Sequence, residues 1–277
     1  MAVINNDEYG IQDPQLYELL LDKFGNGMFG KKLRDEALAE VKDLTIVNTQ
    51  ISDLSFLRFF PNLVQLDVHS NELVSLMGLG FVPQLRRLKI SDNPLMKITS
   101  VRDCISLEVL DISGCAVSDL TPLSNLTNLK LLRASNCNVS DMEPLSDLVK
   151  LELLVADHNH INDLKFLRHM EALSEVDFGY NQIENVFSLL RLPMLTRINL
   201  EYNAIDTLRG FQTMEDLCYL NVRGNRLSGD LNVWYDTLFF VEQLILTEDD
   251  YHYQMDEDYE ASLYEYEHKE QQEGDSQ

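Results

Sequence analysis

A unit of 22 residues repeats in phase through this chain, and this period constrains the fold more than any other feature. Its clearest copy is LTRINLEYNAI, residues 195–205, with apolar residues at positions one, four, six and eleven and asparagine at position nine. A fixed period of this length is typical of a solenoid, in which each copy forms one coil stacked on the next. The first position is apolar in all nine copies: Val41, Leu63, Leu85, Leu107, Leu129, Leu151, Leu173, Leu195 and Leu217.

Each unit predicts a short strand, a turn and a return segment. Around Ile198 apolar and polar residues alternate, as in a strand with one buried face. Asn203 follows where the chain leaves the strand, and its amide can bond backbone groups that the turn leaves without partners. Beyond Ile205 the apolar residues are three apart, a spacing that favours a 3₁₀-like segment over an α-helix.

Position nine forms a column of turn residues across the coils. The column reads Thr49, Asn71, Asn93, Cys115, Cys137, Asn159, Asn181, Asn203 and Asn225. Cys115 and Cys137 are therefore expected to be buried and inert, and Cys104 falls at an apolar position of a return segment. The four cysteines contain no C-x-x-C pair, which favours a reducing compartment over a disulfide framework.

The sequence predicts a helical cap over residues 1–40. Asp13 is a suitable N-cap residue, Pro14 fits the first helical turn, and Gly25 is a stop signal for the short amphipathic helix between them. An open solenoid exposes the flank of its first coil, so an apolar helical face placed before the repeats is expected to cover it.

The C-terminal end departs from the repeat. Residues 228–240 have the spacing of an α-helix, with Ser228 or Asp230 as its cap, and residues 241–246 predict a last strand. Residues 247–277 contain twelve acidic residues and five of the chain's 11 tyrosines, and are expected to be mostly disordered. Tyr259, Leu263 and Tyr266 could form one turn that docks on the last coil.

Charge and composition limit the classes of partner that this chain can bind. The chain has 277 residues, 45% of them hydrophobic, and a net charge of −24. Such acidity disfavours nucleic acid and membrane surfaces and favours a protein partner with a basic patch, unless it serves only to keep an elongated protein soluble. No apolar run is long enough to span a bilayer, and the acidic N-terminus lacks the features of a secretory signal. We expect a cytoplasmic monomer, or a nuclear one in a eukaryote.

Residues 41–246 resemble the 22-residue class of leucine-rich repeats found in bacterial internalins and in the regulatory subunit of protein phosphatase one. The resemblance rests on the pattern L-x-x-L-x-L-x-x-N/C-x-L and on residues 117–154, VSDLTPLSNLTNLKLLRASNCNVSDMEPLSDLVKLELL. It implies an α/β solenoid shaped as a curved horseshoe, with a parallel sheet on the concave face and 3₁₀ or irregular segments on the convex side. It also implies protein binding on the concave face, without enzymatic activity.

Candidate binding residues come from positions that the core does not use. The third, fifth and eighth positions of successive coils should form columns about 4.8 Å apart on the concave face. They bring together apolar and aromatic side chains suited to binding a protein, unless these simply pack against one another. The candidates are Val109, Leu131, Leu153, Val155, His158, Tyr180, Tyr202 and Tyr219.

A second candidate is a basic group on an acidic protein. It consists of Arg86, Arg87, Lys89, Lys130 and Arg133. These side chains could receive an acidic segment of a partner or of this chain's own tail. Charge pairing across neighbouring strands is the simpler alternative.

The sequence gives little support for catalytic activity. The chain contains no G-x-S-x-G, no H-E-x-x-H and no phosphate-binding glycine loop, so we expect no enzyme, cofactor or metal site. Asp157, His158 and His160 are close in sequence, but this spacing is weak evidence for a metal ion. Two functional hypotheses remain: a stand-alone recognition module, and a regulatory subunit of an enzyme such as a protein phosphatase.

Overall fold

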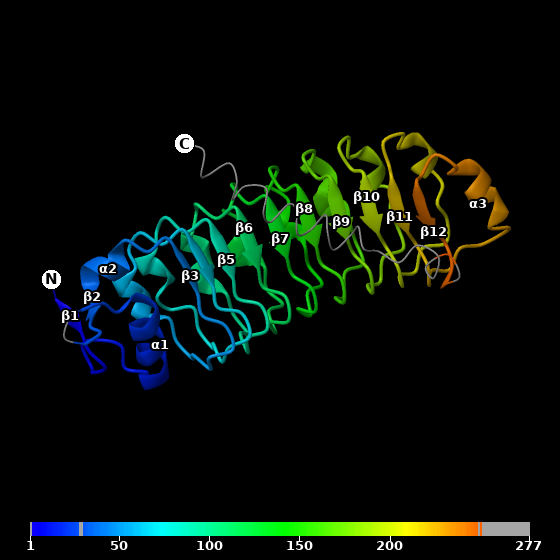
Figure 1. The fold of residues 1–277 in the computed structure, drawn as a ribbon. Helices are drawn as coiled ribbons and strands as arrows, with labels where there is room; N and C mark the ends of the chain where they lie inside the picture. Colours follow the sequence, from blue (N-terminus) through cyan, green and yellow to red (C-terminus); the bar gives the residue numbers. More distant parts are fainter. Residues whose placement is uncertain (1, 28–29, 249, 251–277) are drawn as a thin grey trace.

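Short parallel strands form a single curved sheet along one side of an elongated body. The computed structural model describes residues 2–27, 30–248 and 250. Within them the sheet has ten strands in the order β12-β11-β10-β9-β8-β7-β6-β5-β4-β3, so each strand pairs with its neighbours in sequence. Figure 1 shows these strands side by side, with turns and short helical segments on the other side of each coil. The predicted α/β solenoid is confirmed.

The strands stay in register with the 22-residue period. Arg197 pairs with Glu175 on one side and with Tyr219 on the other, so equivalent positions form columns along the solenoid. The strands are β3 (Asp43–Thr45), β4 (Gln65–Asp67), β5 (Arg87–Lys89), β6 (Val109–Asp111), β7 (Leu131–Arg133), β8 (Leu153–Val155), β9 (Glu175–Asp177), β10 (Arg197–Asn199), β11 (Tyr219–Asn221) and β12 (Gln243–Ile245).

The return segments form 3₁₀ turns, as their spacing of three predicts. Each turn buries apolar side chains against the back of the sheet, as Phe166 and Leu167 do. The turns are η1 (Ser55–Phe59), η2 (Leu79–Phe81), η3 (Thr99–Asp103), η4 (Thr121–Leu123), η5 (Glu143–Leu145), η6 (Lys165–His169), η7 (Leu189–Arg191) and η8 (Phe211–Thr213).

A helical cap covers the first coil. Helix α1 (Pro14–Phe24) is capped by Asp13, whose carboxylate accepts hydrogen bonds from the N–H groups of Gln15 and Leu16. Leu16 and Leu20 bury the apolar face of this helix. A two-stranded antiparallel sheet and a second short helix complete the cap: β1 (Val3–Ile4), β2 (Leu33–Arg34) and α2 (Asp35–Ala39).

The asparagine column ties neighbouring coils together. The Asn181 amide donates to the carbonyl oxygens of Ala156, Phe178 and Gly179 at 3.0–3.1 Å, and its oxygen accepts from the Ile161 N–H at 2.9 Å. Cys115 and Cys137 occupy the same column, are buried, and donate from sulfur to carbonyl oxygens of the preceding coil. Cys104 is buried in the core as predicted.

The final coil contains a shorter helix than its sequence pattern predicts. Helix α3 covers Asn232–Thr237, with Asp230 accepting from the Asn232 N–H at 3.0 Å. It ends early because fully buried Leu238 closes its last turn, after which the Val241 N–H bonds to the Leu238 carbonyl as in the 3₁₀ turns of other coils.

The prediction for the tail falls almost wholly outside the described residues, which beyond β12 comprise Leu246, Thr247, Glu248 and Asp250. Tyr259, Leu263 and Tyr266 lie outside them. The division of the chain at residues 40 and 246 stays a prediction. Across the described ranges, no helix has the length and apolar content that a bilayer span requires.

Candidate functional site

The eighth position of every repeat has a left-handed backbone, with φ between 49° at Tyr202 and 69° at Gly114. Glycine, asparagine and other short polar residues tolerate this conformation best. Such residues hold it in six coils: Asn48, Ser70, Asp92, Gly114, Asn136 and Gly224. In three consecutive coils the position is aromatic instead. For an ordinary L-residue the left-handed region costs on the order of 1–2 kcal/mol, so other interactions must offset this cost at the three aromatic residues.

His158, Tyr180 and Tyr202 stack into one aromatic ladder. The ring centroids of His158 and Tyr180 are 4.2 Å apart with an interplanar angle of 16°, and those of Tyr180 and Tyr202 are 4.5 Å apart at 21°. Both tyrosines are 37% exposed, and the His158 side chain is 54% exposed. The ladder therefore presents partly preorganised, solvent-accessible aromatic surface at the edge of the sheet.

The C-terminal end of the ladder is held from two sides. The Arg223 guanidinium lies 5.5 Å from the centre of the Tyr202 ring and also pairs with Glu201. The Tyr202 hydroxyl donates to the carboxylate of Glu248, which accepts a second hydrogen bond from Arg223 at 3.1 Å. The bond to Glu248 raises the pKa of Tyr202 above its ordinary value, because it stabilises the neutral phenol.

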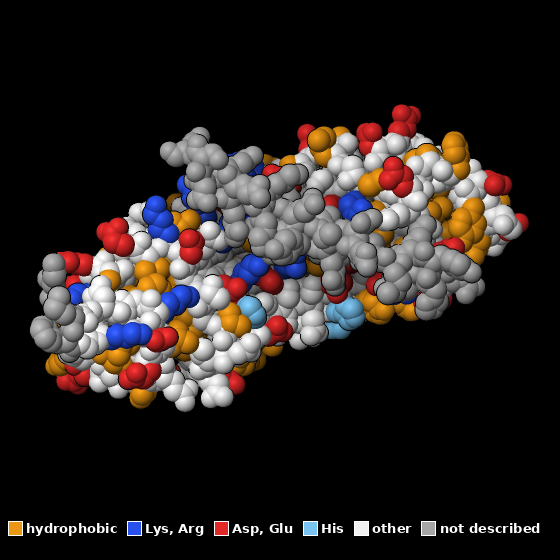
Figure 2. Space-filling model, in the orientation of Figure 1, with side chains coloured by type: hydrophobic (Ala, Val, Ile, Leu, Met, Phe, Trp, Pro, Cys, Tyr) orange, Lys and Arg blue, Asp and Glu red, His pale blue; other side chains and the backbone are white. Residues whose placement is uncertain are grey.

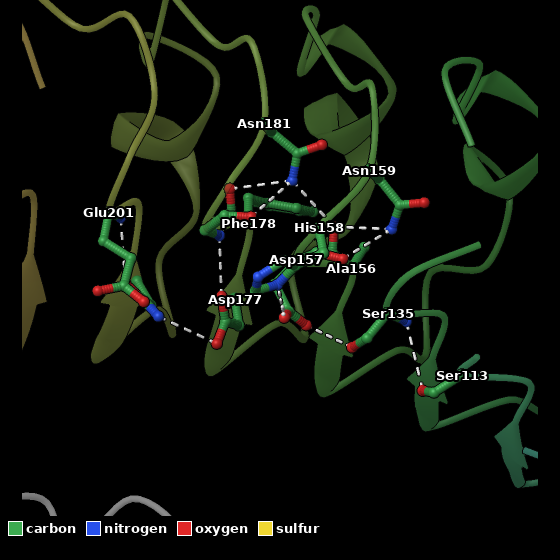
Figure 3. Close-up of polar contacts among 12 residues, drawn as sticks. Ser113, Ser135, Ala156, Asp157, His158, Asn159, Asp177, Phe178, Asn181 and Glu201 are labelled. Atoms are coloured by element: carbon green, nitrogen blue, oxygen red, sulfur yellow. Dashed lines mark hydrogen bonds and ion pairs between the residues drawn. The ribbon is translucent and has the colours of Figure 1, made fainter. Parts of the chain in front are cut away.

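The N-terminal end of the ladder rests on a polar network that crosses three coils. His158 Nδ1 is 2.6 Å from a carboxylate oxygen of Asp157, whose other oxygen accepts from the Ser135 hydroxyl. The Ser135 N–H in turn donates to Ser113 Oγ at 3.3 Å. Figure 3 shows these contacts beside Asn159 of the asparagine column. The network sets the orientation of the His158 ring.

Four predicted site residues form an apolar cluster beside the ladder. Val109, Leu131 and Leu153 align in register at the third position of their repeats, where β6, β7 and β8 begin, and Val155 lies at the fifth position of its repeat, at the end of β8. They form a cluster separate from the solenoid core. The structure brings them together on the sheet face. All four are nevertheless buried, with Leu131 0% and Val155 8% exposed, so their low accessibility differs from the open patch that the sequence suggests.

Tyr219 is also buried rather than open. It is 2% exposed, and the Arg197 guanidinium lies 4.6 Å from the centre of its ring. Of the eight predicted partner-binding residues, the accessible ones are therefore those of the aromatic ladder.

The predicted basic group divides into two sets. Arg86 and Lys130 lie at position two and both pair with Glu108, at 2.9 and 3.4 Å. Arg87, Lys89 and Arg133 lie in the third and fifth columns, on the same face as the apolar cluster. Figure 2 shows Lys and Arg interspersed with Asp and Glu on the face in view. Charge pairing across strands accounts for the first set.

No metal-binding group of three His, Cys, Asp or Glu side chains occurs in the described part of the chain. Several depressions lie among the return segments, away from the sheet face. One is lined by Asn185, Phe187 and Arg168 among others, and another by Leu190, Pro193 and Glu215 among others.

No family model and no curated protein matches this chain. Among solved structures it is similar to internalin inlF of Listeria monocytogenes str. 4b F2365, with 20% identity and a TM-score of 0.72 over 85% of this chain and 75% of that one. It is similar to internalin C2 (inlC2) of the same strain, with 23% identity and a TM-score of 0.75 over 80% and 98%. The functional domain of InlJ from Listeria monocytogenes, described as including a cysteine ladder, has 17% identity and a TM-score of 0.60 over 85% and 59%.

At these identities the likeness concerns the fold. The fold is an internalin-like leucine-rich repeat solenoid, as the sequence pattern predicts.

Proposed function

We propose that this leucine-rich repeat solenoid is a non-enzymatic recognition module that binds a protein partner on its concave sheet face. The aromatic ladder is the observation that carries the proposal. Three aromatic residues occupy left-handed positions that glycine or asparagine would fill at lower cost, and their stacked rings remain partly exposed. Strained residues of this kind cluster at functional sites.

The surroundings of the ladder suit a protein ligand. Tyrosine and arginine are enriched where binding energy concentrates, and here Tyr202 contacts Arg223. The ladder lies at the edge of a sheet face that also carries the apolar cluster and the cations at Arg87, Lys89 and Arg133. A partner would first contact the ladder, since the apolar cluster has little accessible surface. We also propose that the protein is a monomer located in the cytoplasm, or in the nucleus of a eukaryote.

The test compares capture by three full-length baits, the wild type and two variants. One variant carries Tyr180→Asn and Tyr202→Asn, which remove two rings but suit the left-handed backbone. The matched control carries Ser70→Asn and Asp92→Asn in the same column, where φ is 54° and 53°. We expect the wild type and the control to recover a specific protein. The ladder variant should recover about tenfold less of that protein. Equal recovery by all three baits would contradict the proposal.

The identity of the captured protein separates the two functional hypotheses. A single catalytic subunit recovered in near-equal amount would favour a regulatory subunit of an enzyme. A non-catalytic protein would favour a stand-alone module.

A further inference from the structure

We propose that the concave sheet face has a ligand within the same chain, the acidic segment of residues 251–277, which docks along the strands and competes with the partner. Only the competition rests on the proposed function; the docking stands independently of it. The segment lies outside the described residues. Its sequence, the described residues that lead into it, and the charges of the sheet face support the inference.

The chain before residue 251 is anchored at the C-terminal end of the sheet. The Asp250 carboxylate accepts hydrogen bonds from the Leu246 N–H at 2.9 Å, the Thr247 N–H at 2.8 Å and the Tyr235 hydroxyl at 2.6 Å. These bonds hold the pKa of Asp250 below its usual value, although partial burial acts in the opposite direction. Residues 251–277 therefore begin from a fixed point beside the last strand.

Glu248 already shows how an acidic residue of this region contacts the sheet edge. Its carboxylate bonds both the Tyr202 hydroxyl and the Arg223 guanidinium. The acidic C-terminal region thus starts on the side of the coil that carries the aromatic ladder. Further carboxylates along the same path would find the same kind of partner, a cation beside an aromatic or apolar side chain.

The sheet face has a local excess of positive charge at β5 to β7. The third and fifth columns as a whole contain four cations, at Arg87, Lys89, Arg133 and Arg197, and five carboxylates, at Asp43, Asp67, Asp111, Glu175 and Asp177. Within β5 to β7 these columns hold Arg87, Lys89 and Arg133 against one carboxylate, Asp111. The whole chain has a net charge of −24, and residues 251–277 contribute nine acidic residues against one lysine. Most of the protein surface repels an acidic segment, so the positively charged part of the sheet face at β5 to β7 is the favoured place for the segment to bind.

The segment is long enough and chemically suited to this face. Its 27 residues could extend to roughly 90 Å, whereas the seven strand spacings from β12 to β5 cover only about 34 Å. Its five tyrosines provide rings that can pack on the cluster of Val109, Leu131, Leu153 and Val155. Because a tethered ligand has an effective concentration of about millimolar, weak individual contacts suffice.

Zero-length cross-linking of the dilute full-length protein with a carbodiimide tests the docking without any partner. This reagent joins carboxylates to amines that lie in contact. We expect tail carboxylates such as those of Glu260 and Glu265 to couple to Lys130 and Lys89, near the apolar cluster. Lys97 and Lys165, in the return segments, are the internal controls and should couple to the tail about tenfold less. The preference should fall as salt rises from about 0.05 to 0.5 M, because exposed charges are then screened.

Two further arms make the result decisive. A full-length variant with Asp256→Asn, Glu257→Gln, Asp258→Asn and Glu260→Gln should lose most coupling of the remaining tail carboxylates to Lys89 and Lys130. In a mixture of isotope-labelled and unlabelled protein, the two residues of each cross-linked pair should carry the same label, because both belong to one molecule.

Several outcomes would overturn the proposal. One is that no tail carboxylate becomes cross-linked, or that the tail couples to Lys97 and Lys165 as much as to Lys89 and Lys130. Another is that the four substitutions leave the coupling unchanged. A majority of cross-linked pairs with mixed label would identify a second copy of the chain as the occupant. Equal recovery by the three baits would contradict the proposed function but leave the cross-linking result untouched, so the two proposals fail separately.

Discussion

The ring of Tyr202 lies directly over the backbone of Gly224, and a Cβ atom added to Gly224 would be 2.5 Å from Cδ1 of that ring. The two residues occupy the same repeat position in adjacent coils, and both have positive φ, 49° and 68°. Glycine at 224 thus permits the left-handed turn and also leaves room for the last ring of the aromatic ladder.

Gly224→Ala should be costly for two separate reasons, backbone strain and collision with the Tyr202 ring. We expect a loss of about 2–3 kcal/mol in the free energy of unfolding, measured by denaturant titration. Gly229→Ala is the control, because Gly229 has a φ of 92° but no atom within 4 Å of an added Cβ. Equal losses of unfolding free energy in the two variants would show that the Tyr202 ring does not need the space that Gly224 leaves.

The double substitution Tyr180→Asn and Tyr202→Asn should leave stability within about 1 kcal/mol of the wild type. Relief of left-handed strain offsets the lost stacking of two half-exposed rings. Phe178→Ala provides the contrast, since this ring is 0% exposed in the core and its removal should cost about 3–5 kcal/mol. A large loss in the tyrosine variant would assign those rings to the scaffold.

Asn181→Ala should destabilise the solenoid by roughly 2–4 kcal/mol, because it removes bonds to three carbonyl oxygens and one N–H in a buried turn. Asn181→Cys should cost clearly less. Cysteine occupies this column at Cys137, where its sulfur donates to the Ile112 carbonyl at 3.2 Å. Thermal unfolding of the two variants tests the order, and a reversed order would contradict the assigned role of the column.

The buried thiols should make stability fall in alkali. Burial raises the pKa of Cys104 and Cys115 to about 11 and that of Cys137 to about 12, from an ordinary value of 9.0. Above pH 9 the unfolded chain loses these protons first, so it binds fewer protons than the folded chain and unfolding becomes more favourable as pH rises. Denaturant midpoints between pH 8 and 11 should therefore decrease, and substituting Cys115→Ala with Cys137→Ala should flatten the decrease.

The same burial predicts selective alkylation. At pH 8 an alkylating reagent should modify Cys218, which is only partly buried, well before the other three thiols. All four should react together in denaturant. Early modification of Cys137 in the folded protein would contradict its buried place in the asparagine column.

Much of the fold could be predicted because the period is regular. The spacing from Leu195 to Leu217 places every third-position residue next to its equivalent, whatever the side chains are. The helix after Asp13 and the 3₁₀ returns follow from equally local signals. Helix α3 was predicted too long, since its end depends on where the buried Leu238 side chain meets the core rather than on the apolar spacing.

The candidate site was only partly predictable. The columns containing Leu131 and Tyr180 could be read from the period, but the burial of Leu131 could not. Asparagine, aspartate and glycine in the eighth column were an available signal for a left-handed backbone. The strain at His158, Tyr180 and Tyr202 could have been inferred from that signal.

The order of residues alone therefore establishes a stack of coils and the membership of each column, since both depend only on a repeated spacing along the chain. Three-dimensional packing decided which column members remain accessible, that three rings stack 4.2 and 4.5 Å apart, and that Glu248 reaches Tyr202. These features depend on contacts between residues 22 to 46 positions apart, whose side-chain directions no local pattern encodes.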